Sequence, residues 1–212
     1  MQLYTYWRSS AAYRVRIGLN LKGLSAEQLF VPLPEGAQRD TDYLALNPQG
    51  LVPTLIDGDV RLTQSMAILE YLDEMHPDPG LLPKDPAGRA RVRQLAQVMA
   101  CDIHPVDNLK VLNFLTKQMG VSDDARLTWY RHWVDEGLTG LEGLLAGNPD
   151  TGRFCHGDQP SLADLCLVPQ LYNARRFDID LSPYPTVVKI DAACNSLDAF
   201  KIAAPEAQKD AF

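Results

Sequence analysis

One stretch near the start of the chain, LYTYWRSSAAYRVRIGLNL (residues 3–21), predicts how the fold begins. Its apolar first residues are typical of a short strand, and the apolar i, i+4 spacing from Ser10 onward is typical of a helix. Arg8 and Ser9 therefore lie with Ser10 at a strand-to-helix turn. Because a helix N-terminus offers free N–H groups and partial positive charge, this turn favours an anion such as a thiolate.

Strand and helix signals alternate through the first 80 residues. Glu27–Val31 is expected to form a second strand and Asp40–Leu46 a short helix. The Asp-Gly pair within Thr54–Leu62 is a strong signal for a tight hairpin, and Thr63–Met75 follows as a helix. The order βαβαββα predicts a small mixed sheet with helices on both faces.

A proline-rich stretch, residues 77–86, is the best candidate for a linker. Every segment after it has helical spacing, and we expect helices over residues 87–118, 124–146, 161–174 and 184–195. The sequence thus predicts an α+β fold, with one domain over residues 1–80 and an all-helical domain over 86–212. The weakly patterned end of the chain, from Ala203, is expected to fray.

Composition limits the classes of function. The 212 residues carry a net charge of −7, which argues against nucleic acid as the main partner. The four cysteines form no CxxC pair, so we expect no metal site and a reduced, cytoplasmic protein. No signal peptide and no apolar run of ~18 residues is visible, so we expect no membrane partner.

Two further motifs describe a groove for an extended peptide. A cis bond between Val52 and Pro53, just before a strand, would leave the Val52 backbone free to pair with that peptide. Gln64 and Ser65 begin the next helix, where free N–H groups suit a carboxylate. An ordinary loop and an ordinary N-cap remain the alternatives for each motif taken alone.

In the helical half, His104 and Asn108 share a helix face, and Pro105 between them is expected to bend that helix. A histidine on such a face is more often structural than catalytic. Lys110 and Arg176 are by themselves equally typical of solvated charges. Ser161–Asp164 has the form of a capping box that begins a buried helix.

Taken together, these motifs resemble the zeta class of the glutathione S-transferases. The resemblance runs from Leu3 to about Ala203, with motifs in register in both halves. It implies a thioredoxin-like domain that binds glutathione, an all-helical substrate domain, and a homodimer with its active site in the cleft between domains. Within the class, the bacterial maleylpyruvate and maleylacetoacetate isomerases are the most similar.

The resemblance also implies which residues form the site. It assigns thiol activation to Ser9 and Ser10 beside Arg8. It assigns glutathione binding to Gln38, Gln49, Val52, Pro53, Gln64, Ser65, Asp102 and His104. It assigns binding of the dicarboxylate substrate to Arg8, Asn108, Lys110 and Arg176. Val52 would pair with the cysteinyl backbone. Asp102 would reach the γ-glutamyl ammonium across the dimer interface.

One departure from the class concerns the nucleophile. The class often has Ser-Ser-Cys, whereas this chain has Ala11 at the third position, so the nucleophile must be the glutathione sulfur. The resemblance implies cis–trans isomerisation of maleylpyruvate to fumarylpyruvate in gentisate degradation, by reversible thiolate addition to a conjugated C=C bond. The alternatives are maleylacetoacetate as substrate, a transferase acting on α-halo acids, and a non-enzymatic binding protein.

Overall fold

The computed structural model describes residues 1–211 and divides into two compact units. The first unit contains Met1–Leu81 together with the chain from Asn195 onward, and the second contains Leu82–Cys194. The last segment thus groups with the first unit, although the sequence places it in the second domain. The physical reason lies in the packing of helix α10 (Asp198–Ala203) against helix α1 (Ser10–Leu21), described below.

The first unit is built on a four-stranded sheet. Its strands are β1 (Gln2–Thr5), β2 (Glu27–Phe30), β3 (Thr54–Asp57) and β4 (Val60–Thr63), in the order β2-β1-β3-β4. β1 runs parallel to β2, while β1 with β3 and β3 with β4 are antiparallel. The predicted Asp-Gly hairpin is confirmed, because Asp57 pairs with Val60 across a two-residue turn in which Gly58 has φ +58°.

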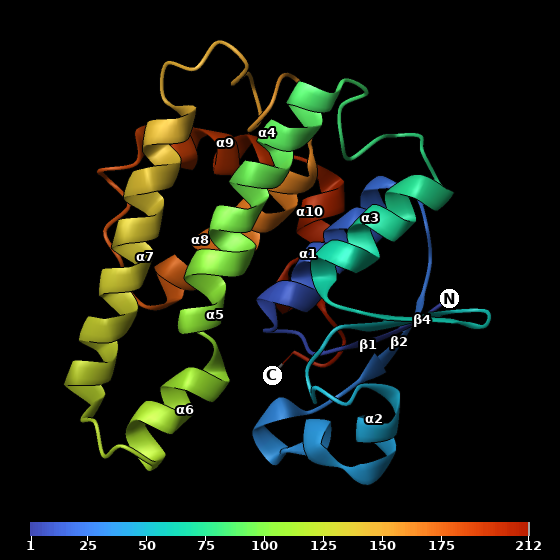
Figure 1. The fold of residues 1–212 in the computed structure, drawn as a ribbon, viewed down its shortest axis with the longest axis vertical. Helices are drawn as coiled ribbons and strands as arrows, with labels where there is room; N and C mark the ends of the chain where they lie inside the picture. The colour runs from blue at the N-terminus through green and yellow to red at the C-terminus, as the bar shows by residue number, and fades with distance from the viewer. Residues whose placement is uncertain (212) are drawn as a thin grey trace. The chain divides into compact units, whose positions relative to one another are not determined.

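Helices cover both faces of this sheet. Figure 1 shows α1 and α3 (Ser65–Met75) on one face and α2 (Thr41–Leu46) on the other. The predicted order βαβαββα is therefore confirmed. α1 ends before Gly23, which adopts φ +64° and whose N–H donates to Asn20 O at 3.1 Å.

Hydrogen bonds hold the segment from Ala203 to Asp210 in place, contrary to the expectation that it frays. α10 packs against α1, and the Asn20 side-chain amide donates to Ala199 O at 2.9 Å. Beyond α10, the Gln208 amide donates to two carbonyls of its own segment, and the Trp7 N–H donates to the Asp210 carboxylate. The bonds from Asn20 and Trp7 span 179 and 203 residues of sequence, and a weak local pattern does not reveal such contacts.

The second unit is helical. It contains α4 (Pro86–Gln97), a π-helical turn (Val98–Ile103), α5 (His104–Val106), α6 (Leu109–Lys117), α7 (Asp123–Leu145), α8 (Leu162–Arg176) and α9 (Pro185–Asn195). α8 is buried along most of its length and packs against α4. Its capping box is formed as predicted, because the buried Asp164 carboxylate accepts hydrogen bonds from the N–H and hydroxyl of Ser161. No helix within residues 1–211 is both long and apolar enough to cross a bilayer.

The single helix predicted over residues 87–118 is wrong in detail, because the structure interrupts it twice. A π-helical turn precedes His104, where Pro105 supplies no N–H to the helical ladder. A new helix then begins at Asn108, whose side chain accepts the Lys110 N–H at 3.0 Å. The bend and the cap thus divide the predicted helix into α4, the π-helical turn, α5 and α6, although its apolar spacing continues through all four.

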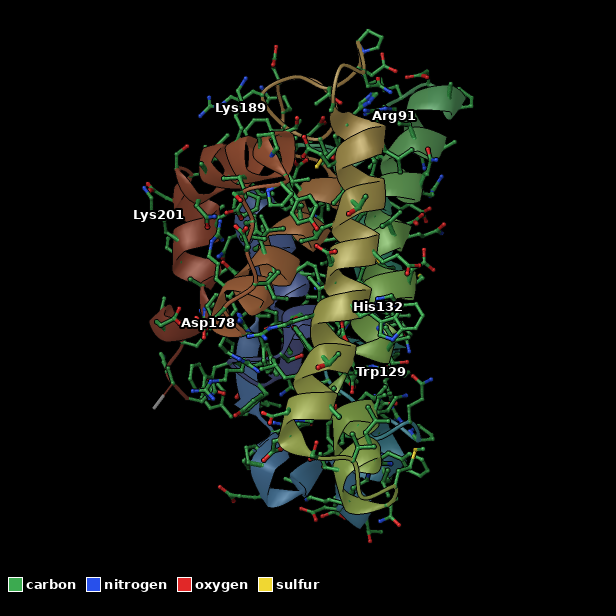
Figure 2. The ribbon with its side chains drawn as sticks, turned by 90° about the vertical axis from the view of Figure 1, so that its left-hand side faces the viewer. Arg91, Trp129, His132, Asp178, Lys189 and Lys201 are labelled. Atoms are coloured by element: carbon green, nitrogen blue, oxygen red, sulfur yellow. The ribbon has the colours of Figure 1, made fainter. Side chains whose placement is uncertain are left out.

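Arg91 on α4 anchors the long loop between α7 and α8. Its guanidinium donates to Cys155 O at 2.7 Å and to the Thr151 hydroxyl at 2.8 Å, and it meets His156 Nδ1 at 3.1 Å. Figure 2 shows Arg91 beside this loop at the upper end of the unit. One side chain therefore satisfies several polar groups of a segment that has no regular structure.

Lys22 joins the end of α1 to the end of α3. Its side chain is fully buried, and its ammonium donates to the Asp73 carboxylate at 2.8 Å and to the carbonyls of His76 and Pro79 at 2.7 and 2.8 Å. All three donors of the ammonium are used, so the buried charge is fully paired.

Replacing Lys22 by methionine is therefore expected to destabilise the protein strongly. The change leaves a carboxylate and two carbonyls without a donor, which corresponds to a loss of roughly 3–5 kcal/mol in the free energy of unfolding. Lys201→Met is the matched control, because Lys201 is exposed on the outside of α10 (Figure 2) and pairs with exposed Asp198. Urea unfolding measures both, and equal midpoints for the two variants would contradict the proposed role of Lys22.

Candidate active site

Ser9 is the N-cap of α1. Its hydroxyl oxygen accepts the Ala12 N–H at 3.2 Å, and its side chain is only half-buried. A hydroxyl that accepts in this way keeps its own hydrogen for donation. Ser10 lies one residue inside the helix and is 6% exposed. The turn therefore presents the Ser9 hydroxyl, rather than that of Ser10, as the better placed donor.

Arg8 is exposed beside this hydroxyl. Its guanidinium carbon lies 4.1 Å from the centre of the Trp7 ring, and Trp7 itself is buried. Stacking on a rigid ring restricts a side chain that is otherwise flexible. The structure thus places one oriented cation next to the Ser9 hydroxyl in sequence and leaves it accessible.

The Val52–Pro53 peptide bond is cis, as the resemblance implies. Among residues 1–211, no hydrogen bond uses the N–H or the C=O of Val52. The preceding carbonyl, that of Leu51, is held by the Tyr43 hydroxyl at 2.6 Å and the Asn47 amide at 2.7 Å. Val52 therefore has two open backbone groups at the end of a segment that its neighbours fix.

The start of α3 has no side-chain cap. Its N-cap residue, Gln64, has φ +71° and ψ 115°, an uncommon conformation for a residue with a side chain. The Gln64 amide donates to Gln49 Oε1 at 2.8 Å, and Arg14 donates to the Ser65 hydroxyl at 3.3 Å. A helix end that is uncapped, and supported by a buried arginine, suits an anionic ligand.

Gln38 approaches the same region through the loop that carries Gln49. The Gln38 side-chain oxygen is buried and has no hydrogen-bond partner among the described residues. A Cβ at Gly50, which has φ +60°, would lie 2.8 Å from the Gln38 carbonyl, so only glycine permits this approach. The loop that carries Gln38 thus contacts the loop that carries Gln49, and the side-chain oxygen of Gln38 is available as an acceptor.

The first unit carries six of the eight predicted cofactor-binding residues, and contacts join Gln49 to Gln64 and bring Gln38 close to Gly50. It offers open backbone groups at Val52, an uncapped helix end at Ser65, and a hydroxyl at the start of α1. A tripeptide with a thiol, a central amide backbone and a terminal carboxylate has groups of the matching kinds. These residues fit glutathione.

The second unit carries the other predicted residues. His104 Nε2 lies 3.4 Å from the Asn108 side-chain nitrogen, so the expected shared face is confirmed. Asp102 and Lys110 are both exposed. Lys110 follows directly after the cap at Asn108, so this segment presents a cation, an amide and an imidazole within seven residues.

Two neighbouring arginines at the end of α8 have different partners. Arg175 forms an ion pair of 2.6 Å with Asp191, whose side chain is 3% exposed. Arg176 is exposed, and its guanidinium carbon lies 4.8 Å from the centre of the Phe177 ring. Both side chains are exposed, but Arg175 is engaged by a carboxylate, so Arg176 is the better candidate for an anionic ligand.

Sequence reasoning missed Asp107, which lies between His104 and Asn108. Both of its carboxylate oxygens are buried and lack a hydrogen-bond partner among residues 1–211, and burial raises its pKa to about 8. It interacts electrostatically with Tyr130, whose ring packs on Phe177 at 4.0 Å. The signal was available, because Asp107 continues the buried i, i+4 series of Met99 and Ile103.

Comparison with known proteins assigns the chain to a family. The glutathione S-transferase N-terminal domain matches residues 1–74, and the corresponding C-terminal domain matches residues 128–197. A probable maleylacetoacetate isomerase of Vibrio cholerae is 52% identical, over 99% of this chain and 97% of its own length. A maleylpyruvate isomerase of a Ralstonia species is 49% identical over 99% of both chains.

Solved structures of similar fold support the same family assignment. A holo maleylpyruvate isomerase, described as a bacterial zeta-class glutathione S-transferase, has a TM-score of 0.98 and 48% identity over all of both chains. A maleylacetoacetate isomerase of Methylobacterium extorquens, solved with bound malonate and glutathione, has a TM-score of 0.96 and 46% identity over all of both chains. The chain belongs to the zeta class of the glutathione S-transferase family, and the predicted α+β fold is confirmed.

Asp107 makes the stability of the protein depend on pH. Its folded-state pKa is raised to about 8, while an unfolded Asp titrates near ~3.9. The folded state therefore holds an extra proton between these values, so the free energy of unfolding falls as pH rises from about 4 to about 8, by on the order of a few kcal/mol. Asp107→Asn is expected to remove this slope.

The measurement is urea unfolding of both proteins at several pH values. Glu74→Gln, an exposed carboxyl on α3, is the control and is expected to leave the slope unchanged. If the wild type and Asp107→Asn lose stability in parallel over this range, Asp107 is not the group responsible.

Proposed function

We propose that this chain converts maleylpyruvate to fumarylpyruvate by glutathione-dependent cis–trans isomerisation. The observation that carries the proposal is the arrangement in the first unit. An open Val52 backbone, an uncapped helix end at Ser65 and the Ser9 hydroxyl occur together with full-length similarity to isomerases of this kind. The substrate is a small dicarboxylate with a C=C bond conjugated to a ketone.

Glutathione is the cofactor. Two open backbone groups at Val52 suit its cysteinyl amide, and the start of α3 with Gln64 and Ser65 suits its γ-glutamyl carboxylate. The unpartnered side-chain oxygen of Gln38 and the amide of Gln49 provide further polar contacts. When bound, glutathione supplies a thiolate that adds reversibly to the conjugated C=C bond, so that this bond rotates while it is single.

Ser9 is proposed to activate the thiol. A free thiol has a pKa near ~8.5, so little of it is thiolate at neutral pH. A hydrogen bond to a charged group contributes ~1.5–3 kcal/mol, and each unit of pKa corresponds to ~1.4 kcal/mol. One hydroxyl at a helix N-terminus is therefore sufficient to lower the thiol pKa by about one or two units. Ser10, in the first turn of the same helix, is proposed to assist in lowering this pKa.

Cations are needed for the substrate. Negative charge develops on its ketone oxygen during the reaction, and its two carboxylates carry charge throughout. Arg8, stacked on Trp7 beside Ser9, is proposed to stabilise the ketone oxygen or the nearer carboxylate. Lys110 and Arg176 are proposed to bind the distal carboxylate with Asn108, since both cations are exposed and guanidinium matches carboxylate bidentately.

The choice of substrate rests on one residue. Ala11 leaves no protein thiol at the turn, which departs from the usual maleylacetoacetate isomerase pattern and favours maleylpyruvate. Relatives of both names match this chain at about the same identity. Maleylacetoacetate is therefore the second candidate substrate. The related structure with bound malonate supports a dicarboxylate in either case.

We further propose that the protein is a cytoplasmic homodimer. Asp102, exposed within the π-helical turn, is proposed to contact the γ-glutamyl ammonium bound by a second copy, and His104 is proposed to complete the tripeptide contacts. Sedimentation and the effect of Asp102→Asn on the KM for glutathione test this assignment together.

Isomerisation predicts that glutathione is required but not consumed. Ultraviolet absorbance of maleylpyruvate and maleylacetoacetate, with and without glutathione, is expected to show rapid conversion only with glutathione and faster conversion of maleylpyruvate. Thiol titration before and after many turnovers is expected to give the same concentration. Stoichiometric loss of thiol, with an α-halo acid as the better substrate, would instead identify a transferase.

Arg176→Ala is expected to weaken binding of the dicarboxylate. Loss of a bidentate, charge-assisted contact corresponds to roughly 1.5–3 kcal/mol, or a ten- to hundredfold rise in KM, with a smaller change in kcat. Lys189→Ala is the control, because Lys189 is an exposed cation on α9 of the same unit (Figure 2). Unchanged kinetics in Arg176→Ala would remove this residue from the substrate site.

A further inference from the structure

The end of the chain contacts the backbone of the turn that carries Arg8 and Ser9. The Trp7 N–H donates to Asp210 Oδ2 at 3.0 Å, across 203 residues of sequence. The other carboxylate oxygen, Oδ1, is buried and has no hydrogen-bond partner among residues 1–211. One oxygen of this partly buried carboxylate thus contacts the turn, while the other is shielded from water.

Arg16 holds the same turn from the opposite direction. Its guanidinium donates to Trp7 O at 2.9 Å, to Tyr6 O at 3.3 Å and to the Thr5 hydroxyl at 3.1 Å. Its Nε donates to Ala203 O at 3.1 Å, at the end of α10. Arg16 is 3% exposed. Burial lowers its pKa to about 10, and the Asp210 carboxylate acts in the opposite direction.

Trp7 is therefore fixed at both of its backbone groups. Asp210 accepts from its N–H, and Arg16 donates to its carbonyl. The Trp7 ring in turn supports the Arg8 guanidinium at 4.1 Å, and Ser9 is the next residue along the chain. A displacement of Trp7 would move the guanidinium and the hydroxyl together.

We propose that Asp210 is a positioning residue for the thiol-activating turn, acting by accepting the Trp7 N–H. The inference rests on the proposed function, because it requires the Ser9 hydroxyl to act on the glutathione sulfur. Asp210 itself touches neither substrate nor cofactor in this scheme. Its effect is transmitted through the backbone of Trp7 to Arg8 and Ser9.

Two substitutions separate the hydrogen bond from the charge. Asp210→Asn keeps an oxygen that accepts the Trp7 N–H but removes the charge, and Asp210→Ala removes both. The thiolate absorbance of bound glutathione is titrated against pH in each variant. Asp210→Ala is expected to raise the thiol pKa by roughly half a unit or more, because a displaced hydroxyl donates a weaker bond. A misplaced turn is expected to lower kcat/KM roughly tenfold.

Asp210→Asn is expected not to raise the thiol pKa. Asp198→Asn, which removes an exposed carboxyl from α10 of the same segment, is the matched control and is expected to match the wild type in both measurements. The proposal is overturned if Asp210→Ala titrates as the wild type does, or if Asp210→Asn raises the pKa as much as Asp210→Ala.

Ser9→Ala distinguishes failure of this inference from failure of the proposed function. A raised thiol pKa in Ser9→Ala, with an unchanged one in Asp210→Ala, refutes only the role of Asp210. An unchanged pKa in Ser9→Ala refutes thiol activation by Ser9, and with it the premise.

A measurement on the wild type covers the case in which Asp210→Ala fails to fold. Hydrogen exchange resolved at the Trp7 amide is expected to be as slow as exchange in β1, because Asp210 accepts this N–H although Trp7 lies beyond the end of the strand. Exchange as fast as that of an exposed loop amide overturns the inference.

Discussion

The first unit depends on one buried guanidinium. Arg16 is surrounded by oxygens from the end of β1, from the turn that follows it and from the end of α10, and it donates to four of them. Trp7 and Ala203 are buried, and their carbonyls lie beyond β1 and at the end of α10, where a buried acceptor needs a donor; Tyr6 O also accepts the Ser9 N–H. A single side chain with five N–H groups satisfies this requirement, and the nearby Asp210 carboxylate offsets its charge.

The candidate site also consists of backbone groups at the ends of regular elements, but here these groups are available to a ligand. Val52 precedes β3, Ser65 begins α3 and Ser9 caps α1, so each lies where a regular element starts. Such ends have unpaired N–H groups that an anion or an extended peptide satisfies. Side chains from the loops, such as Asn47 and Gln49, hold these ends in position without occupying them.

Turn and capping signals were readable from the sequence because they act locally, whereas contacts between distant residues were not. The Asp-Gly turn at Gly58 and the capping box at Ser161 act over a few residues, and both were predicted correctly. The contacts of Asp210 join residues about 200 positions apart, and no periodicity in a short window records them. Asp107 shows an intermediate case, because its place in an apolar helical series was visible but its lack of a partner was not.

The proposed function gives the Ser9 hydroxyl two compatible roles. As an N-cap it must hold its oxygen toward the Ala12 N–H, and as a donor it must direct its hydrogen toward the sulfur. Acceptance of the Ala12 N–H fixes the oxygen and leaves the hydrogen few directions, so the cap orients the donor. This orientation is only useful if the turn itself does not move. A flexible turn would satisfy the cap equally well while the hydrogen missed its target, so under the proposed function the two contacts at Trp7 serve chemistry as well as stability.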